Sequence, residues 1–420
     1  MFFLYQLIIL IIIILSPLII IYRIIKKKEN IFRFKEKFCI FSKKRVVGNV
    51  LWFHGSSVGE LLSILPLVLE LEKKKSISQI LITSSTLSSA EIFKKFKFKK
   101  TIHQFFPIDS IILSYRFLNY WKPTIAIFIE SEIWPSIFRV LNKKKIPLAL
   151  LNARITNKTF KRWDYFKKFS KSIFKNISVA YPQNLETKKY LKKLGISKIK
   201  HLGNLKFIEN KQSNLIKLNN VLIKNFKNKK IWCASSTHLN EELICSKAHI
   251  NLKKKYKNLL TIIIPRHTNR VPEIIQQIKD LKLTVTTHSS NPKNLNNVDI
   301  YLVDTYGETK KFYQVSRVVF MGGSLIKRGG QNPLESTTFG STILHGPNID
   351  NFTDIYKLLD QLKISYKING LTSLTSLINK FINSTNSNKN YLMIDRIGQK
   401  ILKKTTVEFN NLLNNEIKKT

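Results

Sequence analysis

Three acidic residues in the first half of the chain follow short apolar segments, where a carboxylate could take part in acid–base chemistry. Glu60 comes after "NVLWFHGSS" and opens a longer helical-looking segment, whereas Glu130 and Glu132 lie in "FIESEIWPS". At the mouth of a cleft a carboxylate can act as a general base, which typically contributes about 10²–10⁴-fold to a rate. An acid in a first helical turn can also simply complement the helix dipole, so both interpretations of Glu60 stay open. Of the paired acids, we expect one to face the cleft and the other to cap a helix or be solvated.

The segment "RVVFMGGSLIKRGGQNPLES", residues 317–336, has the residue types of an anion site. Its two glycine pairs allow tight turns and let a ligand touch the main chain. Asn332 suits a helix N-cap, Pro333 the first helical position, and Glu335 the third residue after the cap, as in a capping box. A helix that begins there would direct free N–H groups at a phosphate. Glu335 could instead bind ribose hydroxyls, and an ordinary capped strand–turn–helix accounts for the same residues.

Polar and charged residues also follow several other apolar segments of the chain. One His or Arg at a strand end is more often structural, but several at the carboxyl ends of predicted strands are not easily explained in that way. They are Asn152, Arg154, Asn204 and Lys206 in the first half, and Ser235, Ser236, Thr237, His238, Glu241, Arg266, His267, Arg270, Asp304, Tyr306, Gly307 and Glu308 in the second.

These residues are positioned by an alternation of short apolar segments with longer helical-looking ones, as in "TIAIFIESE" and "LLTIIIPRH". Buried parallel strands read as continuous apolar runs, with ligand groups at their carboxyl ends. Two such series lie on either side of an Asn- and Lys-rich stretch at 206–230, in a chain of 420 residues that is too long for one ordinary core. The sequence therefore predicts an α/β protein with two Rossmann-like domains, 29–210 and 211–420, that face a substrate cleft.

The N-terminal segment is apolar enough to enter a membrane. Between Phe2 and Ile25 only Arg23 is charged, and a run of roughly 20 apolar residues is long enough to cross the hydrocarbon core. Three lysines follow the run rather than precede it, and no Ala-x-Ala cleavage site comes after it, so we expect an uncleaved anchor over residues 1–28. The positive-inside rule then places the rest of the protein in the cytoplasm. A buried core helix is the alternative interpretation.

The formal net charge is +45, from 71 Lys and Arg against 26 Asp and Glu. Such a balance favours anionic partners, namely nucleic acid, anionic lipid or a phosphorylated substrate. Because Lys, Asn and Ile are abundant everywhere, an AT-rich genome accounts for the same charge. The basic aromatic stretches at 94–100 and 158–176 would suit an anionic membrane surface, although solvated basic helices have the same composition. The three scattered cysteines indicate a reducing compartment and predict neither a disulfide nor a zinc site.

Taken in order along the chain, these motifs resemble the 3-deoxy-D-manno-octulosonic acid (Kdo) transferase family, which glycosylates lipid A in Gram-negative envelopes. The resemblance runs from the anchor to about Asn351. It rests on "HGSSVGE", "ESEIWP", "NAR", "LGNLKF", "SSTHLNEE", "PRHTNR", "DTYGE", "GGSLIKRGGQNPLE" and "GPNIDNF". Each motif is weak alone, whereas the ordered set is specific. Some relatives have a valine in the serine pair of the first motif, or a His in place of Gln331, and neither difference removes a charged group.

The resemblance implies a GT-B fold with an acceptor-binding N-terminal domain and a nucleotide-sugar-binding C-terminal domain. It implies CMP-Kdo as donor and a lipid A precursor as acceptor, without a metal or cofactor, at the cytoplasmic side of the inner membrane. Glu60 would be the proton acceptor of an inverting transfer, and Glu130 and Lys206 would stabilise the transition state. The residues that match CMP-binding positions are Arg266, His267, Tyr306, Gly307, Glu308, Asn332, Pro333, Leu334 and Glu335.

Two other functions remain open at the level of the sequence. Another GT-B enzyme of lipid A assembly could use a UDP donor, and competition by CMP against UDP separates this possibility from the first. A membrane-tethered nucleic-acid-binding protein would account for the charge. It needs base-stacking or groove-reading motifs that we do not find, and it leaves Glu60 and Glu130 unexplained.

Overall fold

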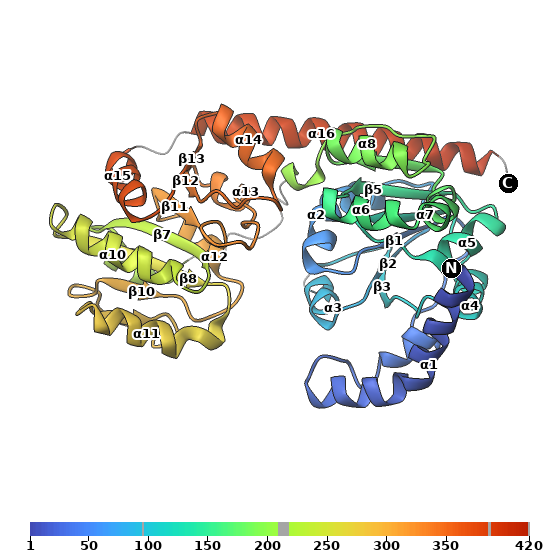
Figure 1. The fold of residues 1–420 in the computed structure, drawn as a ribbon, viewed down its shortest axis with the longest axis horizontal. Helices are drawn as coiled ribbons and strands as arrows, with labels where there is room; N and C mark the ends of the chain where they lie inside the picture. The colour runs from blue at the N-terminus through green and yellow to red at the C-terminus, as the bar shows by residue number, and fades with distance from the viewer. Residues whose placement is uncertain (95, 209–217, 385–387, 419–420) are drawn as a thin grey trace. The chain divides into compact units, whose positions relative to one another are not determined.

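The protein divides into two compact units: residues 1–210 together with 397–420 form unit 1, and residues 211–396 form unit 2. The computed structural model describes all residues of the chain except 95, 209–217, 385–387 and 419–420 (Figure 1). Part of the linker predicted at 206–230 therefore lies outside the described residues.

Unit 1 is built on a six-stranded parallel sheet with the strand order β3-β2-β1-β4-β5-β6. This is the order of a Rossmann sheet, in which the chain starts in the middle and reverses direction once. The strands are β1 Val50–His54, β2 Gln79–Ser84, β3 Thr101–Phe105, β4 Ile125–Ile129, β5 Leu148–Ala153 and β6 Val179–Pro182. The connecting helices are α2 Val58–Glu72, α3 Leu87–Lys94, α4 Ile111–Trp121, α5 Pro135–Lys143, α6 Asn157–Tyr165, α7 Lys167–Phe174 and α8 Leu185–Lys193.

The strands of unit 1 are apolar throughout because both faces of the sheet are covered. In β1, Val50 and Trp52 belong to the core on one face, whereas Leu51 and Phe53 belong to the core on the other. Successive side chains of a strand point to opposite faces, so a sheet with helices on both sides needs a continuous apolar strand. The apolar segments of the sequence predicted this feature correctly.

Unit 2 contains a seven-stranded parallel sheet with the order β13-β12-β11-β7-β8-β10-β9. The strands are β7 Lys230–Thr237, β8 Leu259–Pro265, β9 Val285–Thr287, β10 Ile300–Leu302, β11 Val318–Met321, β12 Thr342–His345 and β13 Ser365–Lys367. Its helices are α9 Asn220–Phe226, α10 Glu241–Lys253, α11 Val271–Asp280, α12 Thr309–Tyr313, α13 Leu334–Thr337, α14 Thr353–Gln361 and α15 Leu371–Phe381.

The last helix, α16 Asn388–Ile417, corrects the predicted domain boundary. The sequence analysis assigned the whole of 211–420 to the second domain, but residues 397–420 belong to unit 1. Ile401, Phe409 and Leu413 are buried in the same core as Phe53. Residues four apart on a helix share a face, so this stripe needs an apolar partner, and the core of the first sheet provides it.

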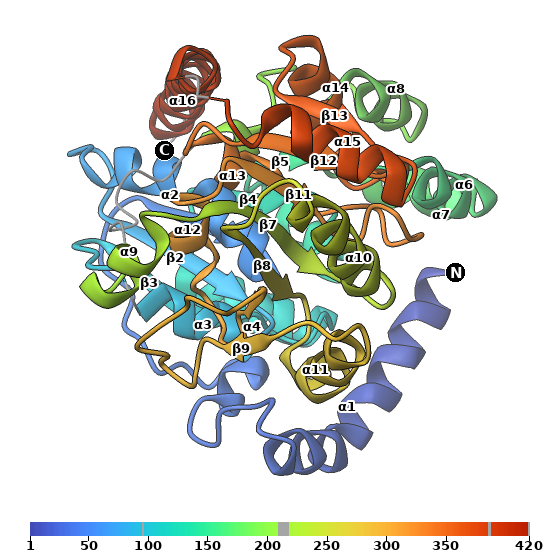
Figure 2. The same cartoon turned by 90° about the vertical axis from the view of Figure 1, so that its left-hand side faces the viewer.

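The N-terminal helix α1, Phe2–Ile25 (Figure 2), is long and apolar enough to cross a membrane. Most of its apolar side chains are exposed. It is therefore not the buried core helix of the alternative interpretation. Its first residues contact unit 1, because the Tyr5 hydroxyl donates a hydrogen bond to Asp109 at 2.6 Å and the Gln6 amide donates one to Ser136 at 2.7 Å. The Arg139 guanidinium also lies 4.1 Å from the centre of the Phe2 ring.

Candidate active site

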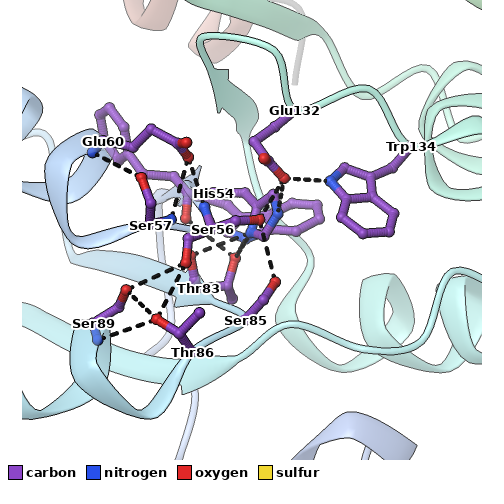
Figure 3. A network of polar contacts seen from close by, with 12 residues as sticks. His54, Ser56, Ser57, Glu60, Thr83, Ser85, Thr86, Ser89, Glu132 and Trp134 are labelled. Carbon is purple, nitrogen blue, oxygen red and sulfur yellow. Dashed lines mark hydrogen bonds and ion pairs between the residues drawn. The ribbon is translucent and has the colours of Figure 1, made fainter. Parts of the chain in front are cut away.

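Glu60 lies at the start of α2, directly after the loop that follows β1. Ser57 is the N-cap, and its hydroxyl accepts a hydrogen bond from the Glu60 N–H at 3.3 Å. In return, the Glu60 carboxylate accepts the N–H of Ser56 at 2.7 Å and that of Ser57 at 3.4 Å, which completes a capping box (Figure 3). The capping interpretation of Glu60 is thus correct as local structure.

The electrostatic surroundings of Glu60 add a second property to this capping residue. Burial raises the pKa of the Glu60 carboxyl, and the negative charges of Glu132 and Glu130 raise it further. Hydrogen bonds from Ser57 and Ser56 oppose the shift, and the resulting pKa is about 7. A carboxylate with a pKa near neutrality can hold and release a proton at physiological pH, as a general base must.

Glu132 lies at the carboxyl end of the neighbouring strand β4 and has the opposite environment. Its Oε2 atom accepts hydrogen bonds from Ser56 Oγ at 2.6 Å, Trp134 Nε1 at 2.8 Å and His54 Nε2 at 3.1 Å (Figure 3). Burial alone would raise the pKa of Glu132, but the hydrogen bond and charge of His54, together with the other two donors, lower it below the ordinary value. Glu132 is therefore the ionised partner of the two acids.

Glu130 forms an ion pair with Lys206, with 2.8 Å between Oε1 and Nζ. The main chain of Glu130 has a φ of 53°, and Asn152 on the next strand has a φ of 50°. Such left-handed conformations cost of order 1–3 kcal/mol for residues with a side chain and are concentrated at functional sites. Asn152 Oδ1 accepts the N–H of Leu205 at 3.0 Å, which ties the Lys206 turn to β5.

The structure therefore brings the three predicted catalytic residues to one edge of the unit 1 sheet. β1 and β4 are adjacent strands, so Glu60 and Glu130 follow neighbouring carboxyl ends. From the sequence, one acid of the pair Glu130 and Glu132 is expected to face the cleft and the other to cap a helix or be solvated. The sequence does not show which acid is which, and it assigns no role to Ser56. The Ser-x-x-Glu pattern from Ser57 to Glu60 fits a capping box and could locate Glu60, but it does not mark the contacts of Ser56 with Glu132.

In unit 2, Arg266 and His267 directly follow β8, and both are exposed. Burial and the positive charges of neighbouring residues, His267 and Arg328 first among them, lower the pKa of His238 to about 4. This edge of the unit 2 sheet is accordingly rich in cations, including Arg328, which the sequence analysis did not single out. Tyr306 is exposed as well.

Glu308, which the sequence analysis matched to CMP binding, is already engaged within the protein. Its carboxylate forms ion pairs with His288 at 2.6 Å and Lys311 at 2.5 Å, and it accepts a hydrogen bond from Thr305 at 2.8 Å. Burial would raise the pKa of Glu308, but its bonds to Lys311 and Thr305 and the charge of His288 lower it overall.

The capping box predicted at residues 332–335 is wrong. The helix α13 has only four residues, Leu334–Thr337, its cap position is Pro333, and no side chain caps it. Asn332 Oδ1 instead accepts the N–H of Leu334 at 3.2 Å, while Glu335 is exposed. A helix of four residues provides no dipole to bind a phosphate. The predicted helix N-terminus therefore does not support an anion site here.

The N–H groups that begin at Gly323, in the first glycine pair, are bound by a carboxylate of the protein itself. Glu241, which is fully buried, accepts the N–H groups of Gly323 at 2.7 Å, Ser324 at 3.2 Å and Leu325 at 3.0 Å, and also that of His238 at 3.0 Å. A Cβ atom on Gly322 would lie 2.4 Å from the carbonyl oxygen of Ser236. These glycines are therefore required by internal packing, rather than by the phosphate that the sequence suggested.

Comparison with solved structures identifies the class of fold. The protein is similar to a glycosyltransferase from Rickettsia africae, with a TM-score of 0.57 and 13% identity over 89% of this chain and 100% of the other. It is also similar to UDP-GlcNAc 2-epimerase from Neisseria meningitidis, with a TM-score of 0.54 and 15% identity over 86% and 99% of the two chains. With its two Rossmann-like units, the protein has the GT-B fold of glycosyltransferases, and an apolar helix precedes it, as predicted.

Sequence comparison identifies the family within this class. Residues 32–209 match the family described as 3-deoxy-D-manno-octulosonic-acid transferase (kdotransferase). The chain is 37% identical over 379 residues to the 3-deoxy-D-manno-octulosonic acid transferase of Rickettsia bellii, covering 89% of each protein. It is 30% identical to that of Haemophilus influenzae, covering 80% of each. The chain belongs to the Kdo transferase family, and the predicted family and enzyme class are confirmed.

Proposed function

We propose that the protein transfers Kdo from CMP-Kdo to a lipid A precursor, with inversion at the anomeric carbon and with Glu60 as the proton acceptor. One observation carries this proposal: a half-buried carboxylate with a pKa of about 7, at the start of α2, follows the strand next to the one that precedes the Glu130–Lys206 ion pair. Membership of the Kdo transferase family supports the choice of sugar.

The proposed reaction assigns a separate task to each of the three residues. The ionised Glu60 carboxylate takes the proton from a hydroxyl of the acceptor sugar, and the resulting oxygen attacks the anomeric carbon of Kdo. The bond from that carbon to the CMP phosphate oxygen breaks, and its electron pair leaves with CMP. Attack from the face opposite to the leaving group inverts the configuration. Glu130 would stabilise the positive charge that develops on the sugar, and Lys206 the donor carboxylate or the leaving phosphate.

Donor binding is proposed for the cationic edge of the unit 2 sheet. Arg266 and His267 are exposed there, and the pKa of His238, lowered by burial and nearby cations, supports an anion site. The assignments of Tyr306, Gly307 and the segment 332–335 to CMP rest on the family resemblance alone. Since the first glycine pair already holds Glu241, side chains rather than that main chain would bind the phosphate.

Membrane attachment through α1 at the cytoplasmic face of the inner membrane is also part of the proposal. Tyr5 and Gln6 contact unit 1 at Asp109 and Ser136, while at the other end Arg23 pairs with Glu29 at 3.1 Å. A helix that crossed the bilayer would place Tyr5 on the opposite side from Asp109. We therefore propose that α1 lies in the interface, and that the cations of the basic helices α6 and α7 would meet anionic lipid.

The membrane arrangement can be tested with the variant Phe3→Cys in inverted inner-membrane vesicles. The natural cysteines at 39, 233 and 245 are all buried, so the folded protein offers one reactive thiol. If α1 lies in the interface, an impermeant maleimide added to sealed inverted vesicles, whose outer surface is the cytoplasmic face, should label the introduced cysteine. Labelling only from the periplasmic side would contradict it.

The activity itself is tested with the full-length protein, CMP-Kdo and a tetraacylated lipid A precursor, with products weighed by mass spectrometry. We expect mass increases of one or more Kdo units, and inhibition by CMP but not by UDP. The absence of transfer from CMP-Kdo, or inhibition by UDP as strong as that by CMP, would contradict the proposal.

A further inference from the structure

Ser56 is the one residue, within the described structure, whose polar atoms reach both Glu60 and Glu132. Its N–H donates to Glu60 Oε2 at 2.7 Å, and its hydroxyl donates to Glu132 Oε2 at 2.6 Å (Figure 3). The main chain of this residue therefore orients one carboxylate, while its side chain is held by the other. A displacement of Ser56 would change the orientation of Glu60.

Glu132 is suited to hold Ser56 because its surroundings keep it ionised. Three donors converge on one oxygen, and one of them belongs to His54, which is fully buried. Burial lowers the pKa of His54, although the neighbouring Glu132 opposes this. A carboxylate can only accept, so His54 Nε2 carries a proton and donates a hydrogen bond to Glu132 in either protonation state of the imidazole.

Further contacts fix this arrangement to β2 and to the start of α3. His54 Nδ1 lies 3.0 Å from Thr83 Oγ1, and the Ser56 carbonyl accepts hydrogen bonds from Ser89 Oγ at 3.2 Å and Thr86 Oγ1 at 3.4 Å. Figure 3 shows these hydroxyls gathered on one side of the Ser56 main chain. The segment from His54 to Ser56 is thus held from β2 and from the start of α3, as a precisely oriented functional group requires.

We infer that Glu132 is a positioning residue for Glu60: it fixes Ser56, whose N–H orients the Glu60 carboxylate, and it places a permanent negative charge beside that carboxylate. This inference rests on the proposed role of Glu60 as the base. Glu132 itself would not contact the substrate. Because the environments of the two acids differ, Glu132 stays ionised while Glu60 can take up the proton.

The charge of Glu132 acts on Glu60 together with a small number of other groups. Glu130 adds a second negative charge from β4, although its ion pair with Lys206 compensates part of it. The Ser56 and Ser57 hydrogen bonds act in the opposite sense. Of the two charged neighbours, Glu132 has the larger effect, so its removal should lower the pKa of Glu60.

The charge effect is tested by Glu132→Gln, which keeps an oxygen for the three donors but removes the charge. We expect the acidic limb of the kcat/KM profile to move to lower pH by about one unit, because Glu60 loses a repelling neighbour. The matched control is Glu70→Gln at the other end of α2, where Glu70 is half-exposed and pairs with Lys73. A limb that stays at the wild-type position in Glu132→Gln would overturn the inference, since a merely structural role predicts lower kcat without a shift.

The positioning effect is tested separately by Ser56→Ala. This variant loses the hydroxyl link to Glu132 but keeps both the N–H directed at Glu60 and the charge of Glu132. We expect kcat to fall about tenfold or more, with the acidic limb near its wild-type pH. Unchanged kcat would contradict the positioning role, and this result is available even if Glu132→Gln does not fold.

A measurement without turnover distinguishes failure of this inference from failure of the proposed function. Infrared titration of carboxyl groups, taken as the difference between each protein and its Glu60→Gln counterpart, isolates the titration of Glu60. A lower midpoint for Glu60 in Glu132→Gln supports the inference even if Glu60→Gln retains turnover, which would refute only the base assignment. An unmoved midpoint refutes the inference even if Glu60→Gln is inactive.

Discussion

Glu60 in unit 1 and Glu241 in unit 2 are both acids at a junction between a strand and a helix, yet they have different chemistry. Glu241 is fully buried and uses both of its oxygens to accept four main-chain N–H groups. Glu60 is half-buried, and the two main-chain N–H groups that it accepts reach the same oxygen. Two other acids act on Glu60 by their charge, and its pKa is about 7.

The difference shows how the number of donors separates a structural acid from a reactive one. A carboxylate whose oxygens are all taken by buried N–H groups completes the local fold and has no capacity left for a substrate. One that completes a capping box with a single oxygen can serve the helix and also exchange a proton. The functional and capping interpretations of Glu60, which the sequence presented as alternatives, are therefore compatible.

The largest effect is expected for Glu60→Gln, which preserves an acceptor for the cap but removes the base. We expect kcat to fall by about 10²–10⁴-fold while CMP-Kdo still binds, because the binding residues are proposed for unit 2. Turnover assays and calorimetric binding of CMP-Kdo measure the two quantities. Glu70→Gln is the control, and near-normal turnover of Glu60→Gln would remove the distinction between the two acids.

The next effect in size is expected for Glu241→Ala, and it concerns stability. Four main-chain N–H groups, two of them buried, would lose their acceptor, and each buried unsatisfied group typically costs about 1–3 kcal/mol. We expect a clear fall in the free energy of unfolding of unit 2, measured by denaturant titration, with a smaller fall for Glu241→Gln. Glu273→Ala on α11 controls for loss of an acid, since Glu273 is exposed. Unchanged stability in Glu241→Ala would mean that this acid is not structural.

The smallest effect is expected for Ser57→Ala, which removes the cap of α2. Loss of a serine N-cap costs about 0.5–2 kcal/mol. The pKa of Glu60 should rise because the Ser57 side chain, whose hydroxyl Ala lacks, lowers it, whereas the Ser57 N–H is kept. The acidic limb of the rate profile would then move to higher pH. Ser110→Ala is the matched control, because Ser110 caps α4 in the same way, away from the three acids. An equal shift in both variants would show that capping alone moves the profile.

Much of the fold could be predicted from the sequence because its signals are local. Strands such as β1 and β4 are continuous apolar runs, and their carboxyl ends are marked by His54 and by Glu130. Glu60 could be located in the same way, since a Ser-x-x-Glu pattern follows a strand. The edge that unites Glu60, Glu130 and Lys206 follows from the adjacency of β1, β4 and β5.

The remaining features could not be predicted because they depend on tertiary partners. Asn332, Pro333 and Glu335 have the residue types of a capped helix, but the chain forms only one helical turn there. The glycines before them suggested a ligand site. Glu241, about eighty residues earlier in the chain, instead accepts the N–H groups of Gly323 and of the two residues after it. The stripe at Ile401, Phe409 and Leu413 predicts an amphipathic helix but not which core receives it. Glu132 is distinguished from Glu130 only by Ser56, His54 and Trp134.

The most direct test of Glu60 as a base is the pH dependence of kcat/KM for the wild-type protein with CMP-Kdo and a lipid A precursor. A base whose pKa is raised is ionised only above that pKa, so activity should rise with pH in a one-proton step. We predict a midpoint near 7, in line with the raised pKa, and loss of this step in Glu60→Gln. A profile that is flat through neutrality, or a midpoint at the pKa of an ordinary carboxyl group, would contradict the assignment.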